Sequence, residues 1–361
     1  MTLANTNTFN HWTSGDRRSI GVNTIIVLLV LYLVVALATI NVGAARISTF
    51  NAIYLWLEAQ KSGEISPVRD VIILFDIRLP RLIMGSFVGA ALAVSGAILQ
   101  SLFRNPLADP GIIGVSAGAS LGAVSVIVLG AGPLAFLVVH LRIFALPIAA
   151  FLGALAVTML LYKISTSNGK TSIITMLLAG IALQALAAAL TGILIFMADD
   201  QQLRDLTFWS LGSLAGATWS KVLASSLIII ASFLVLPFLA KSLNAMALGE
   251  TAAFHMGIRV QQAKSIGVCV SAAATGAAVA VSGGIGFVGI VVPHLLRLFM
   301  GPDNRYLLPA SALLGASLLL VADAISRVIV APAELPIGIL TAQIGAPFFL
   351  WLLLRRRGLL F

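Results

Sequence analysis

Residues 104–118 read RNPLADPGIIGVSAG and separate two long apolar runs. Pro106 and Pro110 prevent a helix from continuing here, because proline lacks the amide N–H and clashes with the preceding turn. Non-helical backbone at membrane depth persists only where protein buries it or where it lines a water-filled path. The stretch therefore predicts a structured turn between two complete membrane-spanning helices.

The composition of the whole chain is typical of a polytopic membrane protein. Of its 361 residues, 60% are hydrophobic and 10% are charged, whereas soluble domains have about 25% charged residues. The net charge of +9 comes from lysines and arginines that lie singly or in small groups at the ends of apolar runs. This distribution lacks the basic stripe of a nucleic-acid-binding protein. We therefore expect no nucleic-acid partner.

Apolar runs long enough to cross a hydrocarbon layer of about 30 Å predict ten helices. They lie near residues 20–40, 81–102, 112–132, 143–163, 172–197, 219–240, 264–282, 286–300, 307–325 and 336–354. With the N-terminus inside, thirteen of the 22 lysines and arginines are cytoplasmic and nine are external. This excess follows the positive-inside rule and predicts that both termini are cytoplasmic.

The predicted organisation is a cytoplasmic tail of residues 1–19, a ten-helix membrane domain of residues 20–354 and a basic cytoplasmic tail of residues 355–361. The first apolar run could instead be a cleavable signal peptide, because residues 36–38 (Ala-Leu-Ala) imitate a cleavage site. We favour a retained helix, since about 20 apolar residues are enough to cross the membrane.

Glycines recur at four-residue spacing in several runs. Gly114, Gly118 and Gly122 would share one face of a helix. Small residues at this spacing let neighbouring backbones approach closely. The pattern predicts tight helix packing at these three positions.

The sequence contains no Walker A motif, no HExxH motif and no paired intramembrane carboxylates. Asp323 is the best candidate for an embedded acid, and Arg327 four positions later predicts a local ion pair. His294 has no neighbouring histidine in the sequence, which favours packing over a metal role. An ion-coupled secondary transporter needs buried coupling acids, and a membrane enzyme needs an assembled catalytic set. A pore subunit powered by separate proteins fits better than either.

Seven motifs resemble the FecCD family of ABC importer permeases, which carry iron chelates, haem and cobalamin. In chain order they are IRLPR (77–81), RNPLADPGIIGVSAGAS (104–120), FWSLGSL (208–214), NAMALGE (244–250), GGIGFVGIVVPHLLR (283–297), LLPASALLGASLLLVAD (307–323) and ELPIGILTAQIGAPFFLWLLL (334–354). The resemblance implies an all-α type II ABC importer permease fold. It also implies a homodimer in the bacterial inner membrane, two cytoplasmic ATPase subunits that bind ATP and Mg, and a periplasmic substrate-binding protein. The chain itself would be no enzyme and would bind no metal or cofactor.

The resemblance assigns roles to residues near both membrane faces. At the outer face it implies that Arg78, Arg81 and Arg327 pair with glutamates of the binding protein. Planar guanidinium groups suit bidentate capture of carboxylates. Ordinary snorkelling of arginine at the interface is the alternative.

At the inner face, residues 241–263 resemble the helices that couple the permease to its ATPase. The most telling positions are Leu248, Gly249, Glu250, Ala253 and Gly257. We expect two short helices with breaks at the two glycines. The length of the loop argues against a plain connection, because helices that pack together are usually joined by about 2–8 residues.

The family turn that corresponds to residues 104–118 contributes to a cytoplasmic gate. This resemblance places Asn105 and Leu107 in the gate, with Ser172 and Ile173 as its second layer. The substrate is expected to be haem, because residues 201–219 and 332–357 are most similar to haem permeases. A ferric siderophore or cobalamin is the alternative, since no cluster of His, Tyr or Met marks an axial iron ligand.

Overall fold

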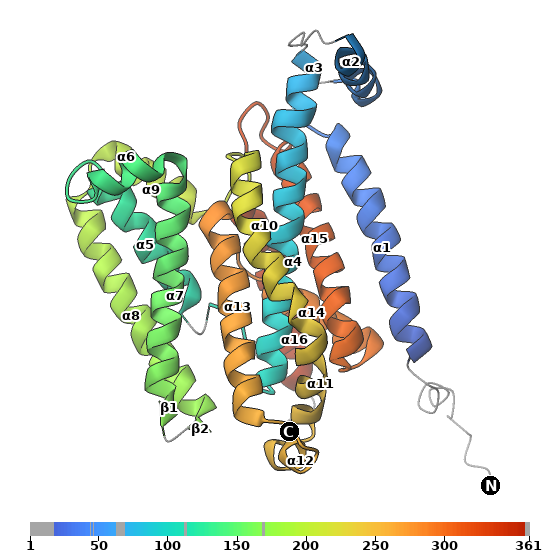
Figure 1. Cartoon of the computed structure of the whole chain (residues 1–361), viewed down its shortest axis with the longest axis vertical. Helices are drawn as coiled ribbons and strands as arrows, with labels where there is room; N and C mark the ends of the chain where they lie inside the picture. Colours follow the sequence, from blue (N-terminus) through green and yellow to red (C-terminus); the bar gives the residue numbers. More distant parts are fainter. Residues whose placement is uncertain are drawn as a thin grey trace.

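The computed structural model describes residues 18–43, 45, 47–62, 69–111, 114–167 and 170–357. The predicted N-terminal tail lies almost wholly outside these residues, as do the last four residues of the C-terminal tail. The chain forms a bundle of helices that run side by side (Figure 1). We call its two ends the α9 end and the α12 end, after the short helix that lies at each (Figure 1).

The helices and strands follow one another with short connections. They are α1 (Arg18–Asn41), α2 (Thr49–Ser62), α3 (Arg69–Ile72), the π-helix η1 (Ile73–Arg78), α4 (Leu79–Leu102), α5 (Val115–Leu129), α6 (Ala135–Leu141), the 3₁₀ helix η2 (Arg142–Phe144), α7 (Ala145–Ser165), β1 (Thr166–Ser167), β2 (Lys170–Thr171), α8 (Ile173–Met197), α9 (Asp200–Ser210), α10 (Trp219–Leu234), α11 (Leu236–Ala247), α12 (Glu250–His255), α13 (Val260–Ser282), α14 (Val288–Met300), α15 (Asn304–Ser326) and α16 (Ile337–Arg357).

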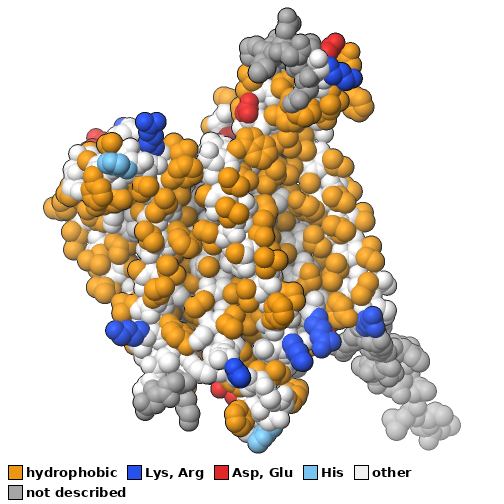
Figure 2. Space-filling view, viewed as in Figure 1, with side chains coloured by type: hydrophobic (Ala, Val, Ile, Leu, Met, Phe, Trp, Pro, Cys, Tyr) orange, Lys and Arg blue, Asp and Glu red, His pale blue; other side chains and the backbone are white. Residues whose placement is uncertain are grey.

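The apolar helices correspond to the ten predicted runs. Among the described residues, six helical stretches are long and apolar enough to cross a membrane, and α10 and α11 together form a bent seventh. The shorter apolar helices α5 and α14, together with residues Ile337–Leu350 of α16, account for the remaining three runs. Hydrophobic side chains cover the middle of the visible face, while charged side chains gather near its two ends (Figure 2). The expectation of an all-α, multi-pass membrane protein is confirmed.

The structure differs from the sequence prediction at residues 219–263. The predicted helix 219–240 bends by 50° between α10 and α11. Pro237 lies in the first turn of α11, where the missing N–H of proline costs nothing because that group has no helical partner. Helix α11 then continues to Ala247. The predicted loop therefore contains one separate short helix, α12, instead of two.

Two further elements were not predicted. Residues 41–80, which separate the first two predicted helices, contain α2 and a helical path that begins at Arg69 and runs into α4. Strands β1 and β2 pair antiparallel between α7 and α8, with Thr166 opposite Thr171. This hairpin lies at the α12 end (Figure 1).

Helix α4 forms the centre of the molecule, and every residue from Val88 to Leu102 is buried. Its glycines let other backbones come close. A Cβ atom on Gly89 would lie 2.3 Å from the carbonyl oxygen of Gly315 in α15, and one on Gly96 would lie 1.9 Å from that of Gly289 in α14. These positions tolerate no side chain, because the obstructing atoms belong to the backbone of the neighbouring helix.

We predict that Gly96→Ala destabilises the protein by about 1–3 kcal/mol, since α4 and α14 must separate to admit the methyl group. Gly192→Ala in α8 is the matched control, because a Cβ there meets nothing within 4 Å. Alanine should leave stability at that site unchanged or raise it, since glycine weakens a helix. Thermal unfolding in detergent measures both variants. Equal unfolding temperatures for the two would contradict the prediction.

Candidate functional site

The turn after α4 satisfies its own backbone with side chains. Asn105 Oδ1 accepts a hydrogen bond from the N–H of Leu107 at 2.9 Å. Asp109 Oδ1 accepts one from the N–H of Gly111 at 2.8 Å. Asn and Asp favour such local bonds, which compete with helix formation. The two prolines stop the helix, and these two side chains then hold the turn in a defined shape.

The same turn reaches deep into the bundle. Gln184 Nε2 donates to the carbonyl oxygen of Gly111 at 2.6 Å. Gln184 is the twelfth residue of α8, so at 1.5 Å per residue it lies roughly 16 Å along that helix. This distance is about half of a hydrocarbon layer of roughly 30 Å. Helix α5, with 15 residues, therefore begins shortly after a turn that lies beside the middle of α8, well inside the bundle.

The three glycines at four-residue spacing pack α5 against α7. Gly114 precedes α5 with φ +77°, a left-handed conformation that favours glycine. A Cβ atom on Gly118 would lie 2.4 Å from the carbonyl oxygen of Gly153, and one on Gly122 would lie 2.1 Å from that of Ala149. The positions singled out from the sequence thus lie at a close backbone contact, and the first of them also starts the helix.

The four predicted gate residues occupy two separate elements. Asn105 and Leu107 are half-buried in the turn after α4. Ser172 is exposed and caps α8, with its hydroxyl accepting from the N–H of Thr175 at 3.3 Å. Ile173 is half-buried and packs on the hydrophobic core. No hydrogen bond found among the described residues joins the two pairs, so their role as a gate stays a prediction.

The predicted coupling region exposes apolar side chains at the α12 end. Leu248 is 72% exposed, and the neighbouring Phe254 and Met256 are also exposed. Gly249 begins α12 with φ +114°, and Gly257 follows it with φ +79°. Ala253 is fully buried, which seats α12 against the bundle. Exposed apolar residues that gather on one surface mark contact sites for other proteins.

Sequence reasoning missed Phe254 and Met256 in this region. The signal was available, because both are large apolar residues in a loop that was predicted to lie outside the membrane. Glu250, at the start of α12, forms an ion pair with the buried Lys264 of α13, with Nζ 2.7 Å from Oε1. No sequence pattern indicated this pair.

At the α9 end, Arg78 and Arg327 bind the carbonyl oxygens at the end of α1. Arg78 donates to the carbonyls of Ile40 and Ala45. Arg327 donates to that of Val42 at 2.7 Å and to that of Thr39 at 3.2 Å. The last carbonyls of a helix lack helical partners and carry partial negative charge. The two guanidinium groups therefore stabilise the end of α1.

Arg81 lies at the centre of a buried ion cluster. Its Nε and Nη2 donate to Asp323 Oδ1 at 2.9 and 2.8 Å, and its Nη1 donates to Glu334 Oε1 at 2.9 Å. The local pair expected between Asp323 and Arg327 is also present, at 3.1 Å. Arg81 and Asp323 are both buried, whereas the Glu334 side chain is 39% exposed.

The three arginines predicted to dock a binding protein are thus buried or nearly so and bonded within the chain. Arg78 and Arg81 are each 6% exposed, and the side chain of Arg327 is 10% exposed. Docking through them requires the present bonds to be exchanged. Their docking role stays a prediction.

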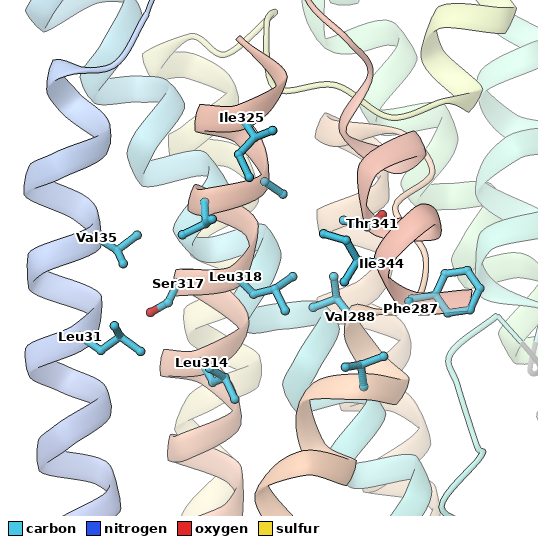
Figure 3. A pocket seen from close by; sticks show the side chains of 14 residues that line it. Leu31, Val35, Phe287, Val288, Leu314, Ser317, Leu318, Ile325, Thr341 and Ile344 are labelled. Atoms are coloured by element: carbon cyan, nitrogen blue, oxygen red, sulfur yellow. The ribbon is translucent and has the colours of Figure 1, made fainter. Parts of the chain in front are cut away.

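An apolar cavity of about 280 Å³ lies between α1, α14, α15 and α16 (Figure 3). Leu31, Val288 and Leu318 are among its lining residues. Its two hydroxyl groups are satisfied internally, since Ser317 donates to the carbonyl of Leu313 and Thr341 to that of Gly338. The lining therefore offers no hydroxyl proton to a ligand. No group of three His, Cys, Asp or Glu side chains in the described part of the chain could hold a metal ion.

The FecCD transport family matches residues 31–355, which include the turn after α4, the α12 region and the Arg81 cluster. The chain belongs to this family.

Relatives with curated descriptions agree with the FecCD assignment. The hemin transport system permease protein HmuU of Yersinia pestis is 45% identical over 91% of this chain and 95% of its own length. The cobalamin import system permease protein BtuC of Halobacterium salinarum is 43% identical over 80% of this chain and 74% of its own length. These relatives are permease components of import systems, so the chain is a membrane permease.

A solved structure agrees with the FecCD fold. An inward-facing metal-chelate-type ABC transporter matches with a TM-score of 0.79 and 30% identity, and the match covers 92% of this chain and 99% of that one. The type II ABC importer permease fold is therefore confirmed.

We predict that Asp323→Asn destabilises this FecCD protein by about 3–5 kcal/mol, because it leaves the buried Arg81 charge poorly compensated. Glu334→Gln is the matched control, since it removes a partly exposed partner of the same arginine and should cost about 1 kcal/mol or less. Thermal unfolding in detergent compares the two. Equal small losses would show that Asp323 does not hold the cluster together.

Proposed function

We propose that this chain is the permease subunit of an ATP-driven importer that moves haem across the bacterial inner membrane into the cytoplasm. The observation that supports haem as the substrate is the match to the hemin permease. This match has higher identity and covers more of both chains than the match to the cobalamin permease of Halobacterium salinarum. Haem is a large, flat and mostly apolar molecule with two carboxylates. A path for it must be wide and must bind it weakly.

The proposed assembly contains two copies of this chain, two ATPase subunits and one periplasmic substrate-binding protein. ATP and Mg are held by the ATPase subunits, since this sequence has no Walker A motif. The exposed side chains of Leu248, Phe254 and Met256 support docking of an ATPase at the α12 end. This end, both chain termini and the gate are then cytoplasmic, and the α9 end faces the binding protein.

At the α9 end, the binding protein would present carboxylates to Arg78, Arg81 and Arg327. Arg78 and Arg327 now bond to backbone carbonyls of the α1 end. A carboxylate forms stronger, charge-assisted bonds with a guanidinium than a neutral carbonyl does. On docking, the two arginines would bond to these carboxylates instead of the carbonyls of α1. The end of α1 would then be held less tightly, so binding of the partner would change the structure of this chain.

In the gate, Leu107 and Asn105 of the two copies would meet across the dimer axis and close the path, with Ser172 and Ile173 as a second layer. The side-chain bonds within the turn and the bond from Gln184 support a turn of fixed shape. Such a turn can close a path when two copies approach each other and open it when they separate.

Reconstitution tests the function. The chain is placed in liposomes with its ATPase and binding protein, and haem uptake is followed with and without ATP, with cobalamin and a ferric siderophore as competitors. ATP-dependent haem uptake that neither competitor suppresses supports the proposal. Uptake of a siderophore or cobalamin in preference to haem overturns the assignment of haem as the substrate. Uptake by the chain alone, driven by an ion gradient without ATP, overturns the proposal that the chain belongs to an ATP-driven importer.

We predict that Leu107→Ala raises the leak of haem through reconstituted dimers in the absence of ATP, because the smaller side chain leaves the closed path incompletely filled. Leu178→Ala, at a 64% exposed position of α8, is the control and should leave the leak unchanged. Release of haem from preloaded liposomes measures both. A Leu107→Ala dimer that is as tight as the parent would mean that the turn shapes α4 and α5 without closing the path.

A further inference from the structure

Lys264, near the start of α13, is a buried cation that bonds to two separate elements. It is 4% exposed. Its Nζ lies 2.7 Å from Glu250 Oε1 in α12 and donates at 3.2 Å to the carbonyl oxygen of Thr171 in β2. One ammonium group therefore joins the first residue of α12 to the last residue of the β1–β2 hairpin. None of the roles discussed above uses this lysine.

The hairpin is also held by the neighbouring turn of α13. Gln261 Oε1 accepts from the N–H of Thr171 at 3.0 Å, and Gln261 Nε2 donates to the hydroxyl of Thr171. The N–H, the hydroxyl and the carbonyl of Thr171 are thus all bonded to α13. Ser172 follows at once and caps α8. Any displacement of Thr171 therefore moves the residue at which α8 begins.

Helix α12, in contrast, has one polar side-chain connection to a membrane helix within the described residues, the pair between Glu250 and Lys264. The Glu250 side chain is 49% exposed and the Lys264 side chain is 5% exposed. Removing one partner of a buried ion pair is costly, because the other charge remains buried and uncompensated. The ammonium group of Lys264 is therefore expected to follow Glu250 when α12 moves. Because the same ammonium group is bonded to Thr171, this movement also displaces Thr171.

We propose that Lys264 is the positioning residue that transmits movement of α12 to the β1–β2 hairpin and so to the gate at Ser172 and Ile173. This inference rests on the proposed function, in which an ATPase docks at the α12 end, and it takes α12 to move with the docked ATPase. The ammonium group acts as a shared anchor, since it holds the docking helix on one side and the hairpin on the other. The two elements lie at the same end of the molecule (Figure 1).

The test places an environment-sensitive fluorophore on the hairpin of the full complex with its ATPase. Ser167 is exposed in β1, so Ser167→Cys on a Cys269→Ser background gives a single labelling site. Emission is compared with and without ATP. Lys264→Met keeps an apolar side chain and removes the charge. In this variant we expect the ATP-driven change in the emission of the label to be smaller by roughly 2- to 30-fold.

Three further variants separate coupling from simple stabilisation. Lys264→Arg keeps the charge and should retain the ATP-driven shift. Lys163→Met removes an exposed lysine of α7 near the same hairpin and should leave the shift unchanged. Glu250→Gln removes the other partner at a half-exposed position and should reduce the shift as Lys264→Met does, even if Lys264→Met fails to fold.

The outcomes distinguish this inference from the proposed function. A full ATP-driven shift in both Lys264→Met and Glu250→Gln, with the parent complex responding normally, overturns the role of Lys264 alone. A parent complex that shows neither an ATP-driven shift nor ATP-driven uptake overturns the proposed function and this inference together. Loss of the shift in both variants with ATPase binding retained supports the inference.

Discussion

Backbone contacts at glycine hold the centre of the molecule together. Membrane lipid is as apolar as leucine, so helices in a bilayer gain little by burying apolar side chains against one another and depend on close packing. Helix α4 meets α15 at Gly89 and Gly315, and it meets α14 at Gly96 and Gly289. Gln100 then donates to the carbonyl oxygen of Gly289 at 3.2 Å. The close approach therefore also brings a polar side chain within reach of the neighbouring backbone.

The ion cluster at the α9 end joins the same pair of helices. Arg81 lies near the start of α4, and Asp323 lies near the end of α15. The glycine contact and the bidentate ion pair thus join α4 and α15 at two heights. Arg327 extends the cluster to the end of α1. These bonds connect α1, α4 and α15 into one unit.

The helices of this fold could be predicted from the sequence, because each helix satisfies the hydrogen bonds of its own backbone. A run of about 20 apolar residues is a property of one segment, so all ten runs could be recognised without knowledge of their neighbours. The bend between α10 and α11 was missed although Pro237 marks it, because the apolar run continues past the proline. Of the candidate site, the glycines of α5 and the exposed Leu248 were recognisable from local patterns.

The partners of buried charges could not be predicted in the same way. Asp323 has Arg327 four positions away, but its bidentate partner is Arg81, 242 positions earlier in the chain. Lys264 has no acidic neighbour in its helix, and its partner Glu250 lies beyond the intervening turn. Such pairs depend on which helices become neighbours, and the helices are brought together by glycine contacts that carry no charge pattern.

The two ends of the bundle differ in how their charges connect the elements. At the α9 end, three arginines share several acceptors on α1, α15 and the segment before α16, so one bond can break while the others hold. At the α12 end, one lysine connects α12 to β2. A shared network resists displacement, because its members constrain one another. Lys264 gives α12 its one polar side-chain bond to a membrane helix within the described residues, whereas Thr171 of β2 is also bonded to Gln261. Among the described residues, the charged side chains therefore hold the α9 end through several bonds, whereas they attach α12, at the opposite end, through a single ion pair.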